Sequence, residues 1–120
     1  MAKILIIDDD DQMRYLLTRM LTRDGHKVSL AEDGVEGMQV FYKFNPDLVI
    51  TDIVMPNKDG LEVIAEILAK NHKQPIISMS GGRRILAADL DSNEITGVKY
   101  MLKKPFTHQQ LKDAVQLALS

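Results

Sequence analysis

The chain has 120 residues, of which 45% are hydrophobic and 27% charged, a composition ordinary for one compact globular domain over residues 1–120. Its formal net charge of −2 argues against non-specific binding to nucleic acid or to an anionic membrane. There is no cysteine, which excludes disulfides and thiol chemistry. There is also no signal-peptide pattern at the start and no apolar run near the roughly 20 residues that cross a bilayer, so we predict a soluble, cytoplasmic protein.

Short apolar runs alternate with amphipathic stretches in the first half of the chain. Residues 4–7 are continuously apolar, as expected of a parallel strand covered on both faces. Apolar residues over 13–21 then recur at helical spacing, and residues 28–30 are a weaker strand candidate. The segment 33–44 predicts a further helix, which ends before Asn45 because Pro46 disfavours continuation.

The second half of the chain continues this alternation. The strand candidates have apolar runs and lie at 48–51, 76–79 and 100–102. The helix candidates lie at 61–68, 83–92 and 111–118, and the middle one is poorly patterned. A strand followed by a helix, repeated five times, predicts a parallel sheet with helices on both faces, since such crossovers are right-handed. Five strands fit the flavodoxin-like, doubly wound α/β fold with strand order 2-1-3-4-5.

Polar residues follow the strands that would be neighbours in this order. Asp8 and Asp9 follow the first strand, Asp52 follows the third, Ser80 follows the fourth and Lys104 follows the fifth. Ligands of open α/β sheets bind outside the carboxyl ends of the strands, near the point where the strand order reverses. We therefore expect three carboxylates, a hydroxyl and an ammonium group to converge at one edge.

Carboxylates that lie within a few ångströms of one another repel and raise each other's pKa values unless a cation is present. A hard divalent ion with few protein ligands and several waters is typical of Mg²⁺, which completes its shell with phosphate oxygens. A carboxylate can attack phosphorus and hold the group as an aspartyl phosphate, while a lysine and a hydroxyl stabilise the charge. The predicted edge contains a candidate for each of these roles.

Several motifs, in this order and spacing, make the chain resemble the receiver domains of bacterial two-component response regulators. Residues 3–10 resemble the opening of the family, and residues 47–56 resemble its phosphoacceptor segment, with Asp59-Gly60 following. Residues 75–80 resemble the fourth strand with its switch hydroxyl, and Lys104-Pro105-Phe106 resembles the family's Lys-Pro-Phe signature. The resemblance spans almost the whole chain.

The resemblance implies a role for each acidic residue of the predicted edge. Asp52 would be the phosphoacceptor. Asp9 and Asp52 would bind Mg²⁺ directly, together with the backbone carbonyl of Val54, and Asp8 would act mainly through a metal-bound water. Asp10 is expected to cap the following helix instead of contacting the metal.

The resemblance also assigns the phosphoryl contacts and the switch. Ser80 and Lys104 would each contact a phosphoryl oxygen, and the bond preceding Pro105 is expected to be cis. Receivers usually carry Tyr or Phe three residues before this lysine, where this chain has Met101, and Tyr100 is one residue too early. A shift of one residue in a strand moves a side chain to the other face, so the usual aromatic switch is not expected here. A rotamer change of Met101 or a backbone shift would have to transmit the signal.

Dephosphorylation and partners are further implications of the resemblance. Val54 and Gly82 stand where receivers often have polar side chains that position the hydrolytic water, so we expect slow autodephosphorylation. The donor would be a histidine kinase or a histidine phosphotransfer protein. An effector protein or domain would bind through the segments 83–92, 100–102 and 111–118. A homodimer is possible, and no direct contact with nucleic acid or membrane is expected.

The same residues argue against three other classes of protein. An aspartyl-phosphate phosphatase needs a second carboxylate two residues after the nucleophile, where Val54 stands. A flavodoxin-like electron carrier should have a Ser/Thr/Gly-rich loop after the first strand, and an inactive pseudo-receiver should have lost an essential residue. We therefore expect a signalling phosphoacceptor that catalyses only its own chemistry, and not an enzyme. The three histidines share no ligand spacing and are expected at the surface: His26, His72 and His108.

Overall fold

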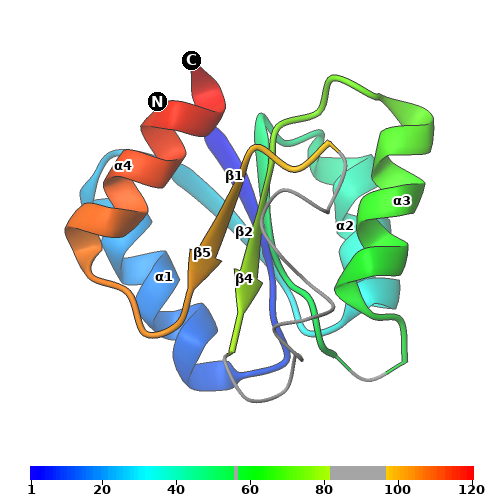
Figure 1. Ribbon diagram of the computed structural model, residues 1–120, viewed down its shortest axis with the longest axis horizontal. Coiled ribbons are helices and arrows are strands. Elements are labelled where there is room, and N and C mark those ends of the chain that lie inside the picture. Colours follow the sequence, from blue (N-terminus) through cyan, green and yellow to red (C-terminus); the bar gives the residue numbers. More distant parts are fainter. Residues whose placement is uncertain (56, 82–96) are drawn as a thin grey trace.

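The computed structural model describes residues 1–55, 57–81 and 97–120, and it contains a five-stranded parallel sheet between two layers of helices (Figure 1). The strand order is β2-β1-β3-β4-β5, which confirms the predicted order. The strands are β1 (Lys3–Ile7), β2 (Lys27–Ala31), β3 (Leu48–Asp52), β4 (Ile76–Ser80) and β5 (Tyr100–Lys103). The helices are α1 (Asp11–Arg23), α2 (Gly34–Phe44), α3 (Gly60–Lys70) and α4 (His108–Leu119). The helix expected over 83–92 lies outside the described residues.

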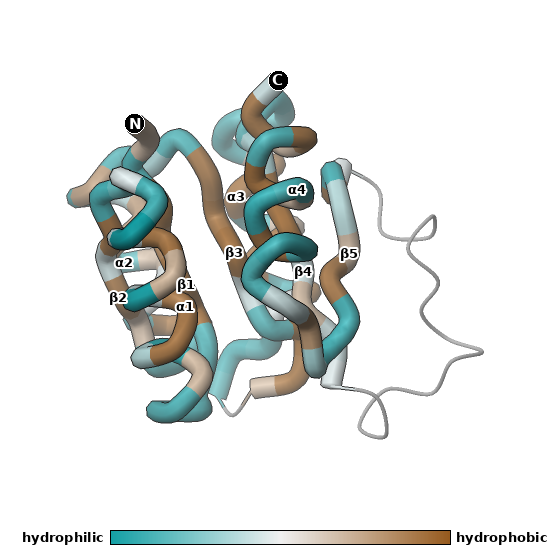
Figure 2. The backbone as a smooth tube through the Cα atoms, turned by 90° about the vertical axis from the view of Figure 1, so that its left-hand side faces the viewer, coloured by the Kyte–Doolittle hydropathy of each residue, from teal (hydrophilic) through white to brown (hydrophobic). Residues whose placement is uncertain are grey.

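Residues alternate between the two faces of the sheet and build two separate cores. Ile6 and Ile50 pack with α1 and α4 on one face, whereas Leu5 and Val49 pack with α2 and α3 on the other. The two helix layers lie on opposite sides of the sheet in Figure 1, and residues 48–50 of the central strand β3 are apolar, the brown part of this strand in Figure 2. Because both faces are covered, these strands are continuously apolar. Each fully buried Leu or Ile side chain contributes about 1.5–3 kcal/mol.

Side chains cap the amino termini of all four described helices. Each cap accepts a hydrogen bond from a backbone amide in the first turn, and the caps are Asp10, Asp33, Asp59 and Thr107. A cap of this kind contributes about 1 kcal/mol, because it satisfies an amide that the helix leaves unpaired. The capping role expected for Asp10 is therefore present. Within the described residues, no helix is long and apolar enough to span a bilayer.

The turn between β3 and α3 depends on a glycine. A Cβ atom added to Gly60 would overlap the carbonyl oxygen of Asp52 and approach the Cα atom of Ile53. The Gly60 amide donates to the Ile53 carbonyl at 2.7 Å, so the loop folds directly back onto the end of β3. This close approach holds the loop that carries Val54 next to Asp52.

Candidate phosphorylation site

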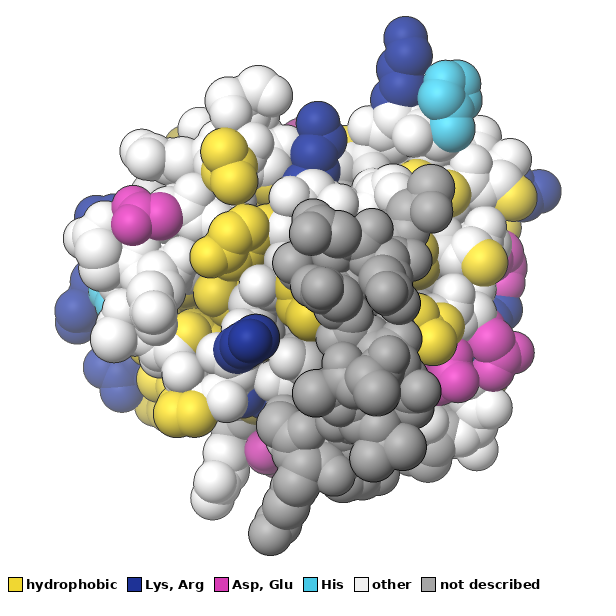
Figure 3. Space-filling model, viewed as in Figure 1, with side chains coloured by type: hydrophobic (Ala, Val, Ile, Leu, Met, Phe, Trp, Pro, Cys, Tyr) yellow, Lys and Arg dark blue, Asp and Glu magenta, His cyan; other side chains and the backbone are white. Residues whose placement is uncertain are grey.

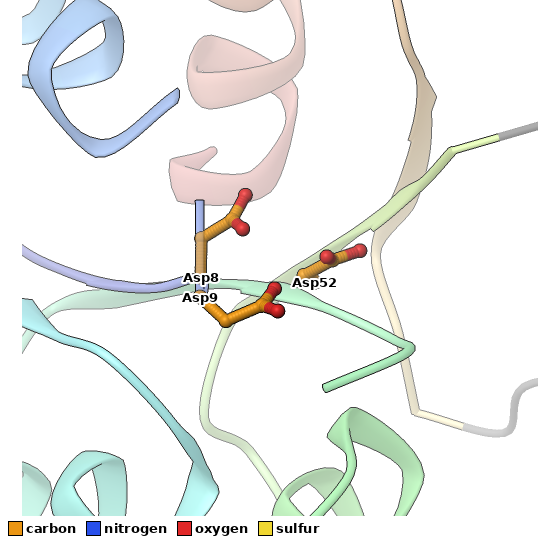
Figure 4. Close-up of side chains that lie close together, drawn as sticks. All are labelled: Asp8, Asp9 and Asp52. Carbon is orange, nitrogen blue, oxygen red and sulfur yellow. The ribbon is translucent and has the colours of Figure 1, made fainter. Parts of the chain in front are cut away.

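Three carboxyl groups meet at the carboxyl edge of the sheet. Asp8 and Asp9 directly follow β1, and Asp52 is the last residue of β3. One oxygen from each lies within 4.8 Å of the others, and Figure 4 shows the three side chains gathered between the ends of these strands. They meet because β1 and β3 are parallel neighbours whose residues Ile7 and Thr51 are in register. The predicted convergence of the three carboxylates is confirmed.

The three carboxyl groups have different surroundings. Asp8 is fully buried, and its Oδ1 accepts a hydrogen bond from the backbone amide of Asp10 at 2.9 Å. Asp52 is also buried, and its Oδ1 accepts from the amide of Ile53 at 2.9 Å. Asp9 is exposed. Two of the three carboxylates are thus held in place by backbone amides, whereas the third faces solvent.

A lysine that directly follows the last strand, β5, joins this cluster. The Nζ of Lys104 donates to Oδ2 of Asp8 at 3.0 Å and lies 3.5 Å from Oδ2 of Asp52. Its backbone amide donates to the carbonyl of Ser80 at 2.9 Å, which continues the β4–β5 pairing beyond β5, and the Lys104–Pro105 bond is cis. Lys104, not the exposed Lys103, therefore faces the carboxylates.

Burial controls the protonation of these groups. It raises the pKa of Asp52 to about 6, although the charge of Lys104 partly opposes this shift, and the charge of Asp8 adds to it. Burial also raises the pKa of Asp8, against the hydrogen bond from the Asp10 amide and the charge of Lys104. Burial disfavours the charge on Lys104, but the Asp52 and Asp8 carboxylates outweigh it and raise the pKa of the ammonium group. One ammonium group does not offset the negative charge of this cluster.

The carboxylates border an open cavity of about 300 Å³. It is lined by Asp9, Asp10, Asp52, Val54, Gly81 and Lys104. All of its ionisable groups except the lysine are carboxyl groups, which are hard oxygen ligands of the kind that Mg²⁺ prefers. The residues present therefore fit a divalent cation, since the donor set is oxygen and the local charge is negative.

The residues predicted to form the switch lie on β4 and β5. Ser80 ends β4, is buried and is in register with Lys103. Met101 is buried against the core on the side of α2 and α3, whereas the side chain of Tyr100 is 41% exposed. The two residues thus point to opposite faces, as the strand period requires. Gly82, predicted to matter for dephosphorylation, lies outside the described residues.

Two features of the structure were missed by sequence reasoning. The guanidinium of Arg14 is largely buried and donates to the carbonyl oxygen of Asp8 at 2.6 Å. The side chains of His26 and His108 are half-buried and make polar contacts that were not predicted, whereas His72 is exposed as expected. His26 accepts from the amide of Ala2 at 3.1 Å, and His108 lies 3.0 Å from a carboxylate oxygen of Asp24. These contacts join residues far apart in sequence, and no local pattern signals them, although an arginine four residues after the cap Asp10 can reach back to the start of its own helix.

The fold and this arrangement define a class of protein. The family model of the response regulator receiver domain matches residues 4–116, so the chain belongs to this family of two-component signalling domains, which are phosphoacceptors.

Known relatives agree with this assignment. The chain is 35% identical over 112 residues to the response regulator MprA of Mycobacterium sp. (strain KMS), covering 92% of this chain and 47% of that protein. It thus spans about half the length of the curated relatives that it matches. A receiver domain protein from Clostridium thermocellum aligns with a TM-score of 0.88 at 32% identity, over 99% of this chain and 94% of that one. TrrA from Thermotoga maritima, solved in complex with Mg²⁺-BeF, aligns with a TM-score of 0.86 at 35% identity, over 99% and 100% of the two chains.

Proposed function

We propose that residues 1–120 form a single receiver domain that accepts a phosphoryl group on Asp52 in a reaction that depends on Mg²⁺. The observation that carries this proposal is the meeting of Asp8, Asp9 and Asp52 within 4.8 Å, with the ammonium group of Lys104 beside two of them. These residues lie at or directly after the ends of three strands, and the oxygen-lined cavity beside them is open to a donor.

The residues that would hold Mg²⁺ are Asp9 and Asp52, with the backbone carbonyl of Val54 as a third protein ligand. Asp9, Asp52 and Val54 line the cavity, whereas the buried Asp8 does not, which supports a role for Asp8 through water. The similar protein TrrA was solved in complex with Mg²⁺-BeF, which supports Mg²⁺ as the cation of this site by similarity. Mg²⁺, when bound, offsets the negative charge of the carboxylates and of the transferred phosphoryl group.

In the transfer, a carboxylate oxygen of Asp52 attacks the phosphorus of a phosphohistidine. The new P–O bond forms as the P–N bond breaks, and the electron pair leaves with the imidazole nitrogen, which takes a proton from solvent. Lys104 already lies 3.5 Å from Asp52, where its ammonium group would stabilise the negative charge on the phosphoryl oxygens. The hydroxyl of Ser80, at the end of the adjacent strand, would donate to another oxygen.

Receiver domains act with kinases and effector domains, and we propose how this chain does so. The donor is a histidine kinase or a histidine phosphotransfer protein. Phosphorylation would bias an existing two-state equilibrium through Ser80 and Met101. An effector or a second copy would bind the surface around β5 and α4, where exposed apolar residues include Tyr100 and Leu117. Figure 3 has the same view as Figure 1, in which β5 and α4 face the viewer, and it shows apolar side chains exposed on this side.

We propose slow autodephosphorylation for the same site. Val54, two residues after Asp52, lines the cavity but has no polar group that could orient a water molecule. The phosphoryl group should therefore persist longer than in receivers with polar side chains at this position and at that of Gly82.

The direct test is incubation with acetyl phosphate and Mg²⁺, followed by intact mass measurement. We expect a gain of one phosphoryl group that EDTA prevents and that is labile to base. Asp52→Asn should abolish the gain, whereas Asp10→Asn, a matched acid that lines the same cavity and caps α1, should retain it. Absence of an adduct in the folded wild-type protein would reject this function and favour a pseudo-receiver. An adduct that survives in Asp52→Asn would place the phosphoryl group elsewhere.

A further inference from the structure

Arg14, in the first turn of α1, reaches back to the loop that carries two of the carboxylates. Its side chain is only 11% exposed, and its Nη1 donates to the carbonyl oxygen of Asp8 at 2.6 Å. Its Nη2 donates to the carboxylate of Asp11 and lies 3.8 Å from that of Glu32, next to the end of β2. The guanidinium therefore connects the loop after β1, the first turn of α1 and the loop after β2.

The carbonyl that Arg14 binds belongs to the peptide between Asp8 and Asp9. Fixing this peptide fixes the direction in which both side chains leave the backbone. A hydrogen bond from a charged donor is about twice as strong as a neutral one, and the planar guanidinium can bind two acceptors at a fixed angle. Lysine, a single charged point on a flexible stem, cannot reproduce this geometry.

Asp9 depends on this support more than its neighbours do. The Asp8 carboxylate is oriented by the Asp10 amide and by Lys104, and the Asp52 carboxylate is oriented by the Ile53 amide. Within residues 1–55, 57–81 and 97–120, no side chain or amide donates to the carboxylate of Asp9. Among the residues that the structure describes, the backbone alone therefore sets the position of the Asp9 carboxylate.

We propose that Arg14 is a positioning residue for the cation site. It holds the Asp8–Asp9 peptide so that the exposed Asp9 carboxylate remains beside Asp52. This inference rests on the proposed function, in which Asp9 and Asp52 bind Mg²⁺. Arg14 would not touch the metal or the phosphoryl group.

Loss of the positive charge of Arg14 is expected to change the Mg²⁺ affinity in the direction opposite to loss of its positioning contact. A cation next to an acidic cluster repels a second cation, so removal of the charge alone would strengthen Mg²⁺ binding. The adjacent carboxylates of Asp11 and Glu32 reduce this repulsion, because they lie directly against the guanidinium. Positioning and charge therefore predict changes of opposite sign, and a measured affinity decides between them.

The experiment is a calorimetric titration of the full chain with Mg²⁺ alone, at constant ionic strength, for the wild type, Arg14→Lys and Arg14→Met. Loss of an outer partner of a metal ligand typically weakens metal binding 10–100-fold, so we expect about a tenfold higher Kd in Arg14→Met and a smaller increase in Arg14→Lys. Saturating Mg²⁺ should restore most of the phosphorylation by acetyl phosphate in both variants, because Asp52 and Lys104 keep their places.

Arg19, on the same helix, is the matched control. It is exposed and its guanidinium contacts only the ring and hydroxyl of Tyr15 among the described residues, so Arg19→Lys and Arg19→Met should bind Mg²⁺ as the wild type does. Urea denaturation in EDTA identifies any variant that is unfolded, and in that case the milder Arg14→Lys carries the comparison.

The outcomes separate this inference from the proposed function. A Kd for Arg14→Met equal to or below that of the wild type, with the wild type binding Mg²⁺ normally, would overturn the role of Arg14 alone. A folded wild-type chain that binds no Mg²⁺ would overturn the proposed function together with this inference. Weakened binding in both Arg14 variants, with unchanged binding in both Arg19 variants, would support it.

Discussion

Replacement of the carboxylate that we propose as phosphoacceptor should stabilise the metal-free protein. Asp52 is buried next to Asp8, and its ionised form is disfavoured in the folded state. Asparagine has nearly the same shape and no charge, so Asp52→Asn removes the buried charge while leaving an acceptor for the amide of Ile53.

The size of this effect follows from the pKa of Asp52, which rises from 3.8 to about 6 on folding. Each unit of pKa corresponds to about 1.36 kcal/mol, so ionised Asp52 reduces the free energy of unfolding by roughly 3 kcal/mol. A raised acid pKa means that the folded state binds the proton more tightly. Stability is therefore lost as the pH rises from 3.8 through about 6, and the full penalty is present above that range. Asp52→Asn also removes an ion-pair partner of Lys104. The gain in the free energy of unfolding should therefore be at most roughly 3 kcal/mol.

The assay is urea denaturation followed by far-ultraviolet circular dichroism, with EDTA present, for the wild type, Asp52→Asn and Asp10→Asn. Asp52→Asn should gain stability at about pH 8 and gain little at about pH 4, where the wild-type carboxyl group is largely protonated. Asp10→Asn should show no such pH-dependent gain, because its side chain is exposed and asparagine caps helices as well as aspartate does. A gain for Asp52→Asn that is the same at both pH values, or larger in acid, would refute the reasoning.

Three further changes test other parts of the site. Gly60→Ala should lower the free energy of unfolding by about 1–3 kcal/mol, since its Cβ overlaps the backbone at the end of β3, and a urea midpoint equal to that of the wild type would contradict this. Lys104→Met should lower the free energy of unfolding by up to about 3 kcal/mol at neutral pH, because the fully buried Asp8 loses its cation. This loss should shrink in acid, and equal losses across a pH series would count against the ion pair. Val54→Asn combined with Gly82→Glu should shorten the lifetime of the phosphorylated protein, as followed by intact mass, and an unchanged decay would argue against the proposed reason for slow hydrolysis.

The sequence alone was sufficient for the strand order and for the meeting of the carboxylates and Lys104 at one edge of the sheet. The apolar runs of 4–7, 48–51 and 76–79 have the length and continuity of covered parallel strands, and turn and helix signals separate them. Since parallel strands end at one edge, the residues that follow them must lie near one another. The convergence of Asp8, Asp52 and Lys104 could be predicted for this reason, before any distance was known.

Burial and long-range contacts required the tertiary structure. The pKa of Asp52 depends on how deeply the carboxyl group is buried and on its distance from Lys104, 52 residues further along the chain. The contact of Arg14 with a backbone carbonyl, and that of His108 with Asp24, depend on side-chain directions that have no sequence period. Local patterns specify which face of a strand or helix a residue occupies, whereas packing of all the elements decides which polar groups lose water and which atoms then remain within reach of one another.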